Sequence, residues 1–308
     1  MRDAFIRSLT RLAEDDERVM LLTADLGFKV LTPFADRFPG RFLNMGVAEA
    51  NMTGMGAGLA LAGMRPVIYS IVPFVAMRCY EQIRDDICYN NVPVTIVGVG
   101  GGFSYGHCGP THHALEDLAL MRLLPNMTVV APGDPVEVEL AMRASLAHEG
   151  PVYVRLGRAG DPIVHPRPPA FALGRAIVVR EGADCTIVAT GGMLPVAVSA
   201  AEALGQAGIR AEVLSMHTVK PLDEEALRQR LQRRIPLFTL EEHFRAGGLG
   251  SAVAEFVASS GGGPLHLLGV SDEFAHLSGD QEHLRRQQGL SADQVAARIR
   301  GILEARRR

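Results

Sequence analysis

The feature that most constrains the fold is the alternation of short apolar strands with helical segments along nearly the whole chain. In the first half, apolar β-branched runs predict strands at 19–24, 66–70, 93–99, 127–132 and 151–156. Between them, helical spacing of apolar residues predicts helices near 3–14, 48–62, 74–89, 115–123 and 134–147. This alternation is typical of a mostly parallel sheet with helices on both faces.

A proline-rich stretch interrupts the alternation. Residues 157–174, GRAGDPIVHPRPPAFALG, contain four prolines and no helical or strand periodicity, which predicts a linker. Beyond it the pattern resumes, with strands at 184–190, 210–216, 236–242 and 264–270 and helices near 195–207, 223–233 and 249–259. We therefore predict two consecutive three-layer α/β/α domains with mostly parallel sheets, residues 1–158 and 174–308, joined by a linker at 159–173.

Composition narrows the functional class. The chain has 308 residues, 47% hydrophobic and 21% charged, with a net charge of −3, so nothing in its charge favours nucleic acid or an anionic membrane. The longest apolar run, 44–63, is interrupted by a carboxylate and by five glycines, which argues against a membrane span. The four cysteines have no metal-site spacing, and the first residues resemble a charged helix rather than a leader. We expect a cytoplasmic protein with free thiols.

One carboxylate is placed unusually. In NMGVAEANMTGMGAGLALAG (44–63), Glu49 is the only residue with a formal charge, and no other lies between Phe42 and Met64. It could simply be a first-turn acid that gains about 0.3–1 kcal/mol from the helix dipole. The glycines and alanines after it, however, predict tight packing on both sides, and a carboxylate buried there needs a partner. Glu49 is therefore a candidate functional residue.

Familiar phosphate and nucleophile motifs are absent from the sequence. There is no G-x-x-x-x-G-K-[ST], no strand-linked G-x-G-x-x-G and no G-x-S-x-G. GVGGGFSYG (98–106) follows a predicted strand. That position suits a backbone-lined ligand loop and a flexible loop equally well.

Longer stretches carry a family resemblance. ADLG (24–27), the segment 42–87 from FLNMGVAEAN to CYEQIRDDI, and GPTHHALEDLALMRLLPNMTVVAPGDPVE (109–137) resemble the pyrimidine-binding domain of transketolase. LSMHTVKPLDEEAL (214–227) and LFTLEEHFRAGGLGSAVAE (237–255) resemble its C-terminal domain. The match covers nearly the whole chain in the right order. The chain thus resembles the C-terminal half of a transketolase that is encoded as two subunits.

The resemblance implies an activity and a cofactor. Transketolases use thiamine diphosphate to transfer a two-carbon ketol unit from a ketose to an aldose. Glu49 matches the family acid that hydrogen-bonds the aminopyrimidine ring and activates the cofactor, a role that suits a poorly solvated carboxylate. Phe74 matches the aromatic residue that packs on this ring, and Tyr80 is a second candidate; otherwise both are ordinary core aromatics.

The resemblance also implies substrate-binding residues. His112, the first histidine of GPTHH, matches a family histidine that contacts donor oxygens. Arg158 matches an arginine that binds the sugar phosphate, as suits a planar guanidinium, although solvation of the linker is the alternative. Lys29 lies near a family residue that contacts the acceptor phosphate.

The donor loop departs from the family pattern. His107 and Cys108, in GHCGP (106–110), stand where most transketolases have acidic residues, and Gly100 stands where they have a histidine. A site built to bind hydroxyls discriminates through such groups, so their replacement predicts a non-standard sugar.

The other half of the cofactor site is missing. The family holds the diphosphate through Mg²⁺ with a G-D-G segment, which this sequence lacks. The resemblance therefore implies a separate N-terminal-half subunit that carries the diphosphate and the metal, with no metal ligands in this chain. We expect an α2β2 heterotetramer in which two copies of this chain contact each other, and no activity without the partner.

Three alternatives stay open. The beta subunit of a 2-oxo-acid dehydrogenase and the synthase of deoxyxylulose phosphate use the same cofactor and a similar architecture. THH and SMHTVKPLD favour transketolase over the dehydrogenase. A non-catalytic binding or scaffold partner is the third alternative, and the retained Glu49 argues against it.

Overall fold

The first sheet has seven strands and includes one strand from the second half of the chain. The computed structural model describes residues 1–158, 160–276 and 279–307. The strand order is β10-β5-β6-β4-β3-β1-β2, parallel throughout except that β10 runs antiparallel to β5. The strands are β1 (Val19–Thr23), β2 (Phe42–Asn44), β3 (Arg65–Ile71), β4 (Thr95–Val99), β5 (Thr128–Val130), β6 (Val152–Leu156) and β10 (Thr218–Lys220).

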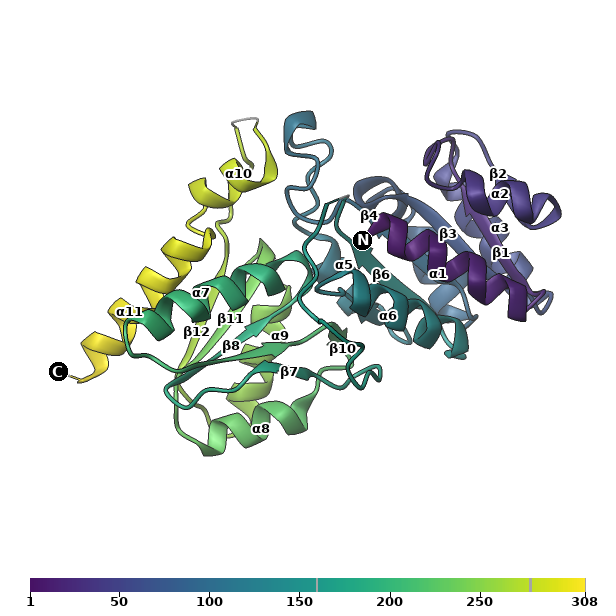
Figure 1. The fold of residues 1–308 in the computed structure, drawn as a ribbon. Coiled ribbons are helices and arrows are strands. Elements are labelled where there is room, and N and C mark those ends of the chain that lie inside the picture. The colour runs from purple at the N-terminus through teal and green to yellow at the C-terminus, as the bar shows by residue number, and fades with distance from the viewer. Residues whose placement is uncertain (159, 277–278, 308) are drawn as a thin grey trace.

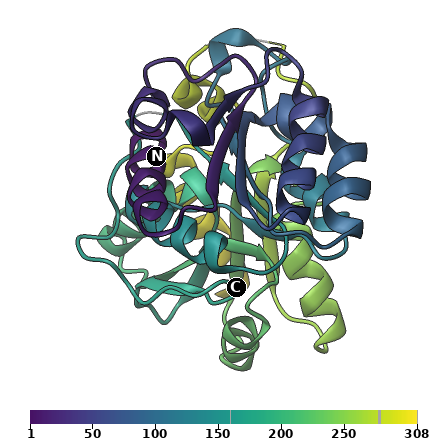
Figure 2. The ribbon, with the colours of Figure 1, turned by 90° about the vertical axis from the view of Figure 1, so that its right-hand side faces the viewer.

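Helices cover both faces of this sheet (Figures 1 and 2). One face packs against α1 (Arg2–Asp15), α2 (Thr32–Arg37) and α6 (Pro135–Ala147). The other packs against α3 (Glu49–Leu61), α5 (Asp117–Leu123) and the segment between β3 and β4. The predicted helix at 74–89 is irregular, since π-helices Pro73–Met77 and Ile83–Tyr89 flank the short α4 (Tyr80–Gln82).

The second sheet has five strands in the order β12-β11-β8-β9-β7. They are β7 (Ile177–Arg180), β8 (Cys185–Ala189), β9 (Ala211–Ser215), β11 (Leu237–Phe244) and β12 (Leu265–Val270), and β7 alone is antiparallel. The helices of this part are α7 (Leu194–Gln206), α8 (Glu224–Gln232), α9 (Leu249–Ser259), α10 (Gln281–Gln287) and α11 (Ala292–Arg307). α7 and α11 pack together on one face, and α8 and α9 lie on the other (Figure 1).

The predicted mostly parallel α/β architecture is confirmed, with some elements not foreseen. All nine predicted strands are present, but β2, β7 and β10 and the helices α2, α10 and α11 were not predicted. β10 also joins the first sheet, although it lies within the range assigned to the second domain. Among the described residues, no helix is both long and apolar enough to span a bilayer.

The predicted linker is anchored at specific points, although many of its described residues are exposed. His165 is buried, and its Nε2 lies 2.9 Å from Oε1 of Glu137 in α6. The backbone N–H of His165 donates to Oδ2 of buried Asp134. Further along, the ring of Phe171 stacks on His217 at 4.1 Å. The linker therefore ties both sheets together through specific buried contacts.

Candidate active site

The candidate site lies at the carboxyl ends of the parallel strands of the first sheet, where ligands bind in open α/β sheets. Three segments converge there: the π-helical segment that begins at Pro73 after β3, the loop 100–113 after β4, and Gly157–Arg158 after β6. The start of α3 contributes Glu49.

Glu49 is buried and has an arginine partner. It is the first residue of α3, its side chain is 2% exposed, and its Oε2 lies 2.7 Å from Nη1 of Arg78, which is 51% exposed. Close packing fixes the helix behind it, since a Cβ at Gly56 would lie 3.0 Å from Ile68 of β3. The partner that a buried carboxylate requires is thus supplied from the segment after β3.

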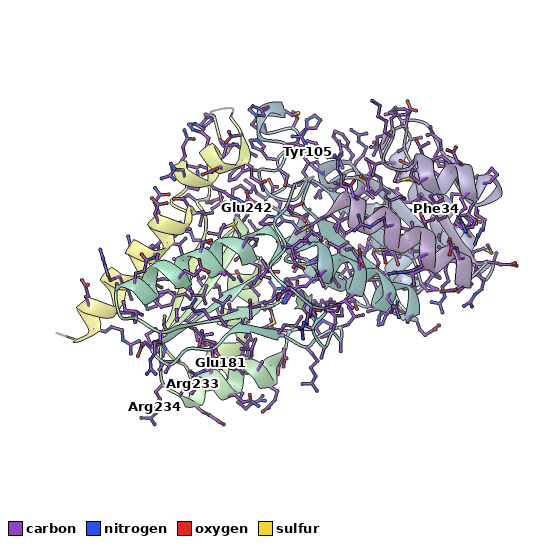
Figure 3. The ribbon with its side chains drawn as sticks, viewed as in Figure 1. Phe34, Tyr105, Glu181, Arg233, Arg234 and Glu242 are labelled. Carbon is purple, nitrogen blue, oxygen red and sulfur yellow. The ribbon has the colours of Figure 1, made fainter. Side chains whose placement is uncertain are left out.

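A series of cation–π and edge-on aromatic contacts continues from Arg78 across the three segments. The Arg78 guanidinium carbon lies 4.9 Å from the Phe74 ring centroid, and the Phe74 ring meets His112 edge-on at 5.3 Å. His112 in turn lies 6.3 Å from Tyr105, and the Arg158 guanidinium carbon lies 5.3 Å above that ring. We call these six residues the contact row: Glu49, Arg78, Phe74, His112, Tyr105 and Arg158. Figure 3 labels Tyr105, which lies near the junction of the two halves of the molecule.

The loop that carries Tyr105 and His112 is anchored at its base and inside. Gly102 and Ala114 exchange two backbone hydrogen bonds, of 2.9 and 3.0 Å. His113 is buried against the edge of the Phe103 ring, its Nε2 lies 3.3 Å from Gly106 O, and burial lowers its pKa. His113 therefore shapes the loop while its neighbour His112 points along the contact row.

Four predicted site residues lie outside the contact row. The Tyr80 hydroxyl donates to Leu120 O at 3.1 Å, which directs it toward α5. Lys29 is exposed on the loop after β1, and His107 and Cys108 are exposed on the turn Gly106–Cys108. Of the predicted set, the structure brings together Glu49, Phe74, His112 and Arg158, and substrate roles for the exposed residues remain predictions.

Two members of the contact row were missed from the sequence. Arg78 could have been found as the first basic residue in the sequence after the strand that packs behind Glu49. Tyr105 had a weaker signal, the glycine at position 100. A Cβ there would lie 2.2 Å from Cε2 of Tyr105, so the tyrosine ring occupies the space that a side chain at 100 would need.

Family comparisons agree with this geometry. Residues 1–160 match the family model of the transketolase pyrimidine-binding domain, and residues 174–295 match that of the transketolase C-terminal domain. The chain belongs to the transketolase family. This confirms the family resemblance and the fold class drawn from the sequence.

Several transketolase relatives match from end to end. The chain is 38% identical over 305 residues to the 6-deoxy-6-sulfo-D-fructose transketolase subunit SqwH of Clostridium sp. (strain MSTE9), covering 99% of this chain and 94% of that protein. It is 36% identical to an apulose-4-phosphate transketolase subunit of Phocaeicola vulgatus, covering 91% and 94%. A solved structure of a split-gene transketolase, described as an inactive beta4 tetramer, matches with a TM-score of 0.91 at 39% identity over 98% of both chains.

The site residues of this transketolase-family chain fit an aminopyrimidine. Within the described residues, Arg78 is the hydrogen-bond partner of Glu49, through Oε2, which leaves Oε1 available to a ligand. The half-buried Phe74 ring lies near that carboxylate, beneath the guanidinium of the same Arg78. Residues 1–158, 160–276 and 279–307 contain no cluster of three or more His, Cys, Asp or Glu side chains that could hold a metal ion.

Proposed function

We propose that this chain is the cofactor-activating subunit of a split, thiamine-diphosphate-dependent transketolase, which moves a two-carbon ketol unit from a ketose to an aldose. The observation that carries the proposal is the contact row, which runs from the buried carboxylate of Glu49 to the exposed guanidinium of Arg158 at the carboxyl edge of the sheet. End-to-end similarity to transketolase subunits supports it.

Each residue of the contact row has a role under this proposal. When bound, thiamine diphosphate supplies the carbon nucleophile to which the ketol unit is transferred. Glu49 holds a proton between its carboxylate and a ring nitrogen of the pyrimidine, and Phe74 supports the ring. Nδ1 of His112 is engaged by the Thr111 hydroxyl at 3.0 Å, so Nε2 is left to bind a donor oxygen. Arg158 binds the anionic end of the sugar.

The proposal includes a partner subunit that carries the diphosphate and Mg²⁺, in an α2β2 heterotetramer. Exposed apolar side chains just before α3 and along it support such docking, because Val47, Met55 and Leu61 are exposed by 74%, 42% and 67%. The related split-gene tetramer is described as inactive, which agrees with self-association of this kind of chain and with a need for the second subunit.

The substrate we propose is a ketose with a non-standard skeleton or terminal group. The relatives are named for a sulfonated fructose and for apulose 4-phosphate. The histidine and cysteine of the donor loop support the same reading, because they replace hydroxyl-binding acids of the family pattern with side chains of different hydrogen-bonding capacity.

A deoxyxylulose-phosphate synthase is the second candidate. The chain is 39% identical to 1-deoxy-D-xylulose-5-phosphate synthase 2 of Geobacter sulfurreducens, but it covers only 48% of that protein. These two transketolase subunits match over more than nine-tenths of both chains, which favours the split transketolase. The two candidates differ in their donor, because the synthase uses a 2-oxo acid.

Reconstitution tests the proposal. The chain is mixed with an N-terminal-half subunit that carries the G-D-G segment, with thiamine diphosphate, Mg²⁺ and an aldose acceptor. The donors assayed are 6-deoxy-6-sulfofructose, apulose 4-phosphate, xylulose 5-phosphate, pyruvate and branched 2-oxo acids. We expect ketol transfer from at least one ketose, none from the oxo acids, and none by either chain alone. Turnover of an oxo acid alone would replace the proposal with the synthase or the dehydrogenase.

The Glu49→Gln variant separates catalysis from scaffolding. It keeps the size of the side chain and should assemble with the partner, as judged by size-exclusion chromatography with light scattering. Turnover should fall by about 100-fold or more, because the group that holds the proton is lost. An assembled E49Q pair with wild-type turnover would make the chain a non-catalytic partner.

A further inference from the structure

The Tyr105 ring sits against the backbone of Gly100, in a place that only glycine leaves open. Gly100 has φ +90°, and a Cβ there would lie 2.2 Å from Cε2 and 2.3 Å from Cδ2 of Tyr105. The backbone below the ring is fixed, because the N–H groups of Gly100 and Gly101 both donate to Leu156 O, at 2.9 and 3.0 Å. The ring therefore rests on an anchored floor at the ends of β4 and β6.

The Tyr105 ring also supports a cation. The guanidinium of Arg158 lies 5.3 Å from the ring centroid, and His112 meets the ring at an interplanar angle of 66°. Arg158 is exposed and has no carboxylate partner among the described residues, whereas Arg78 at the other end of the contact row is paired with Glu49. Of the two arginines in the contact row, the one without a carboxylate partner is therefore Arg158, which lies beside Tyr105.

The position of Arg158 depends on Tyr105 for a physical reason. A long, exposed arginine side chain samples many rotamers, and ordering it costs conformational entropy. A tyrosine ring beneath the guanidinium stabilises one placement through a cation–π contact. The planar fork then presents its N–H groups to an oxyanion in a fixed orientation.

We propose that Tyr105 is a specificity-determining positioning residue, which seats Arg158 so that the site selects sugars ending in a tetrahedral oxyanion. The inference rests on the proposed transketolase function and adds to it a residue that positions Arg158. Gly100 is needed for the same arrangement, because any larger residue there displaces the Tyr105 ring. Phosphate and sulfonate share the required geometry and charge.

Kinetics of the reconstituted pair test the proposal through the ratio of kcat/KM for an anionic ketose to kcat/KM for its uncharged analogue. Xylulose 5-phosphate is compared with xylulose, and 6-deoxy-6-sulfofructose is compared with 6-deoxyfructose. The first pair tests a phosphate and the second a sulfonate. Tyr105→Leu should lower the ratio about fivefold through KM. Tyr105→Phe keeps the ring and should retain the wild-type ratio, and the exposed, distant Tyr89→Leu is the matched control.

Two kinetic outcomes would overturn the proposal. If Y105L impairs charged and uncharged donors equally, the tyrosine is merely structural. If Y105F falls as far as Y105L, the hydroxyl contacts the substrate itself. Gly100→Ala should follow Y105L, because its Cβ pushes the ring away.

A binding measurement tests the inference without relying on turnover. Inorganic phosphate, with sulfate as the second probe, is titrated into the assembled pair by calorimetry. The wild type and Y105F should bind with similar affinity, whereas Y105L and Arg158→Met should bind at least about fivefold more weakly. Equal binding by the wild type and Y105L, or no saturable binding by either, overturns the role of Tyr105. An inactive wild-type pair that binds phosphate in the expected order would contradict only the proposed function.

Discussion

At the scale of single residues, the two members of the Glu49–Arg78 pair differ in their freedom to move. Glu49 is 2% exposed and held at the first turn of a tightly packed helix, whereas Arg78 is 51% exposed on a long side chain. Arg78 also lies over the face of Phe74 on which we propose that the pyrimidine packs. We therefore expect the arginine to act as a counterion that stabilises the buried carboxylate and that a bound ligand displaces.

Removing this counterion should weaken the cofactor-free chain. Arg78→Met leaves Glu49 buried without a hydrogen-bond partner, which we expect to lower the free energy of unfolding by about 1–2 kcal/mol. Urea unfolding of the isolated chain measures the effect. Arg84→Met is the control, because Arg84 pairs with Asp85 at the surface and should contribute less than about 0.5 kcal/mol.

A double variant checks the cause. The effects of E49Q and R78M should not add, because either substitution alone removes the same ion pair. Strict additivity, or equal destabilisation by R78M and R84M, would show that Arg78 does not support the carboxylate.

At the scale of elements, the second half of the chain holds the loop that carries Tyr105 and His112. Glu242, labelled in Figure 3, is buried in β11 and accepts two hydrogen bonds from Arg285 of α10, at 2.9 and 2.8 Å. Its carboxyl group lies against Gly102 at the base of the loop, where a Cβ would lie 2.4 Å from Glu242 Cδ. The side-chain amide of Gln281 donates hydrogen bonds to both Glu242 and Ser104 and so connects the two residues. α10 thus fixes the loop through Glu242.

Breaking this support should loosen the loop. Arg285→Met leaves the Glu242 carboxylate buried without its cation and should destabilise the chain by about 3 kcal/mol. Hydrogen exchange of residues 100–114 should become faster than in the wild type. The neighbouring Arg286→Met is the matched control, because Arg286 pairs with exposed Asp293. Unchanged exchange in R285M would show that the loop does not depend on α10.

The sequence predicted the elements whose signal is local. Buried parallel strands such as β4 are continuous β-branched runs, so composition alone identifies them. The strands β2 and β10 have three residues each and form only because a distant partner is present. Glu49 could be found because one charge in an apolar helix is conspicuous. Tyr105 had only the weak signal of Gly100, since its role depends on a loop conformation and on Arg158 from another strand end.

At the scale of the whole molecule, a buried acid–histidine pair joins the linker to both halves. Glu137 of α6 accepts from the Ser215 hydroxyl at 2.7 Å and lies 2.9 Å from His165 Nε2. Burial acts to lower the pKa of His165, but the hydrogen bond and charge of Glu137 outweigh it and raise that pKa. Burial acts to raise the pKa of Glu137, but His165 and its other donors outweigh it and lower that pKa. The other titratable groups that face this pair are Asp134 and His217.

This pair predicts a pH dependence of stability. A raised histidine pKa stabilises the fold below about pH 6.5 and loses its effect as pH rises through the folded value. A lowered glutamate pKa stabilises it above about pH 4.5 and loses its effect as pH falls through the folded value. The contribution should therefore be largest between these limits, on the order of 1 kcal/mol.

His165→Asn measures this contribution. Its loss of stability against the wild type should be larger at pH 5.5 than at pH 9, as measured by urea midpoints. His283→Asn, exposed on α10, should leave the pH profile unchanged. An H165N difference that is the same at both pH values would mean that folding does not raise the pKa of His165.

The placement of β10 has a consequence for any attempt to divide the molecule. Its pairing with β5, together with the hydrogen bond from Ala131 N–H to His217 O, covers one edge of the first sheet with backbone from the second half. A fragment ending at residue 160 would leave the peptide groups of Thr128–Val130 uncovered, and an uncovered strand recruits other chains. We expect such a fragment to aggregate in light-scattering measurements while the full chain does not. A recombinant of two related genes that joins halves of different origin would accordingly have to keep the pairing between β5 and β10.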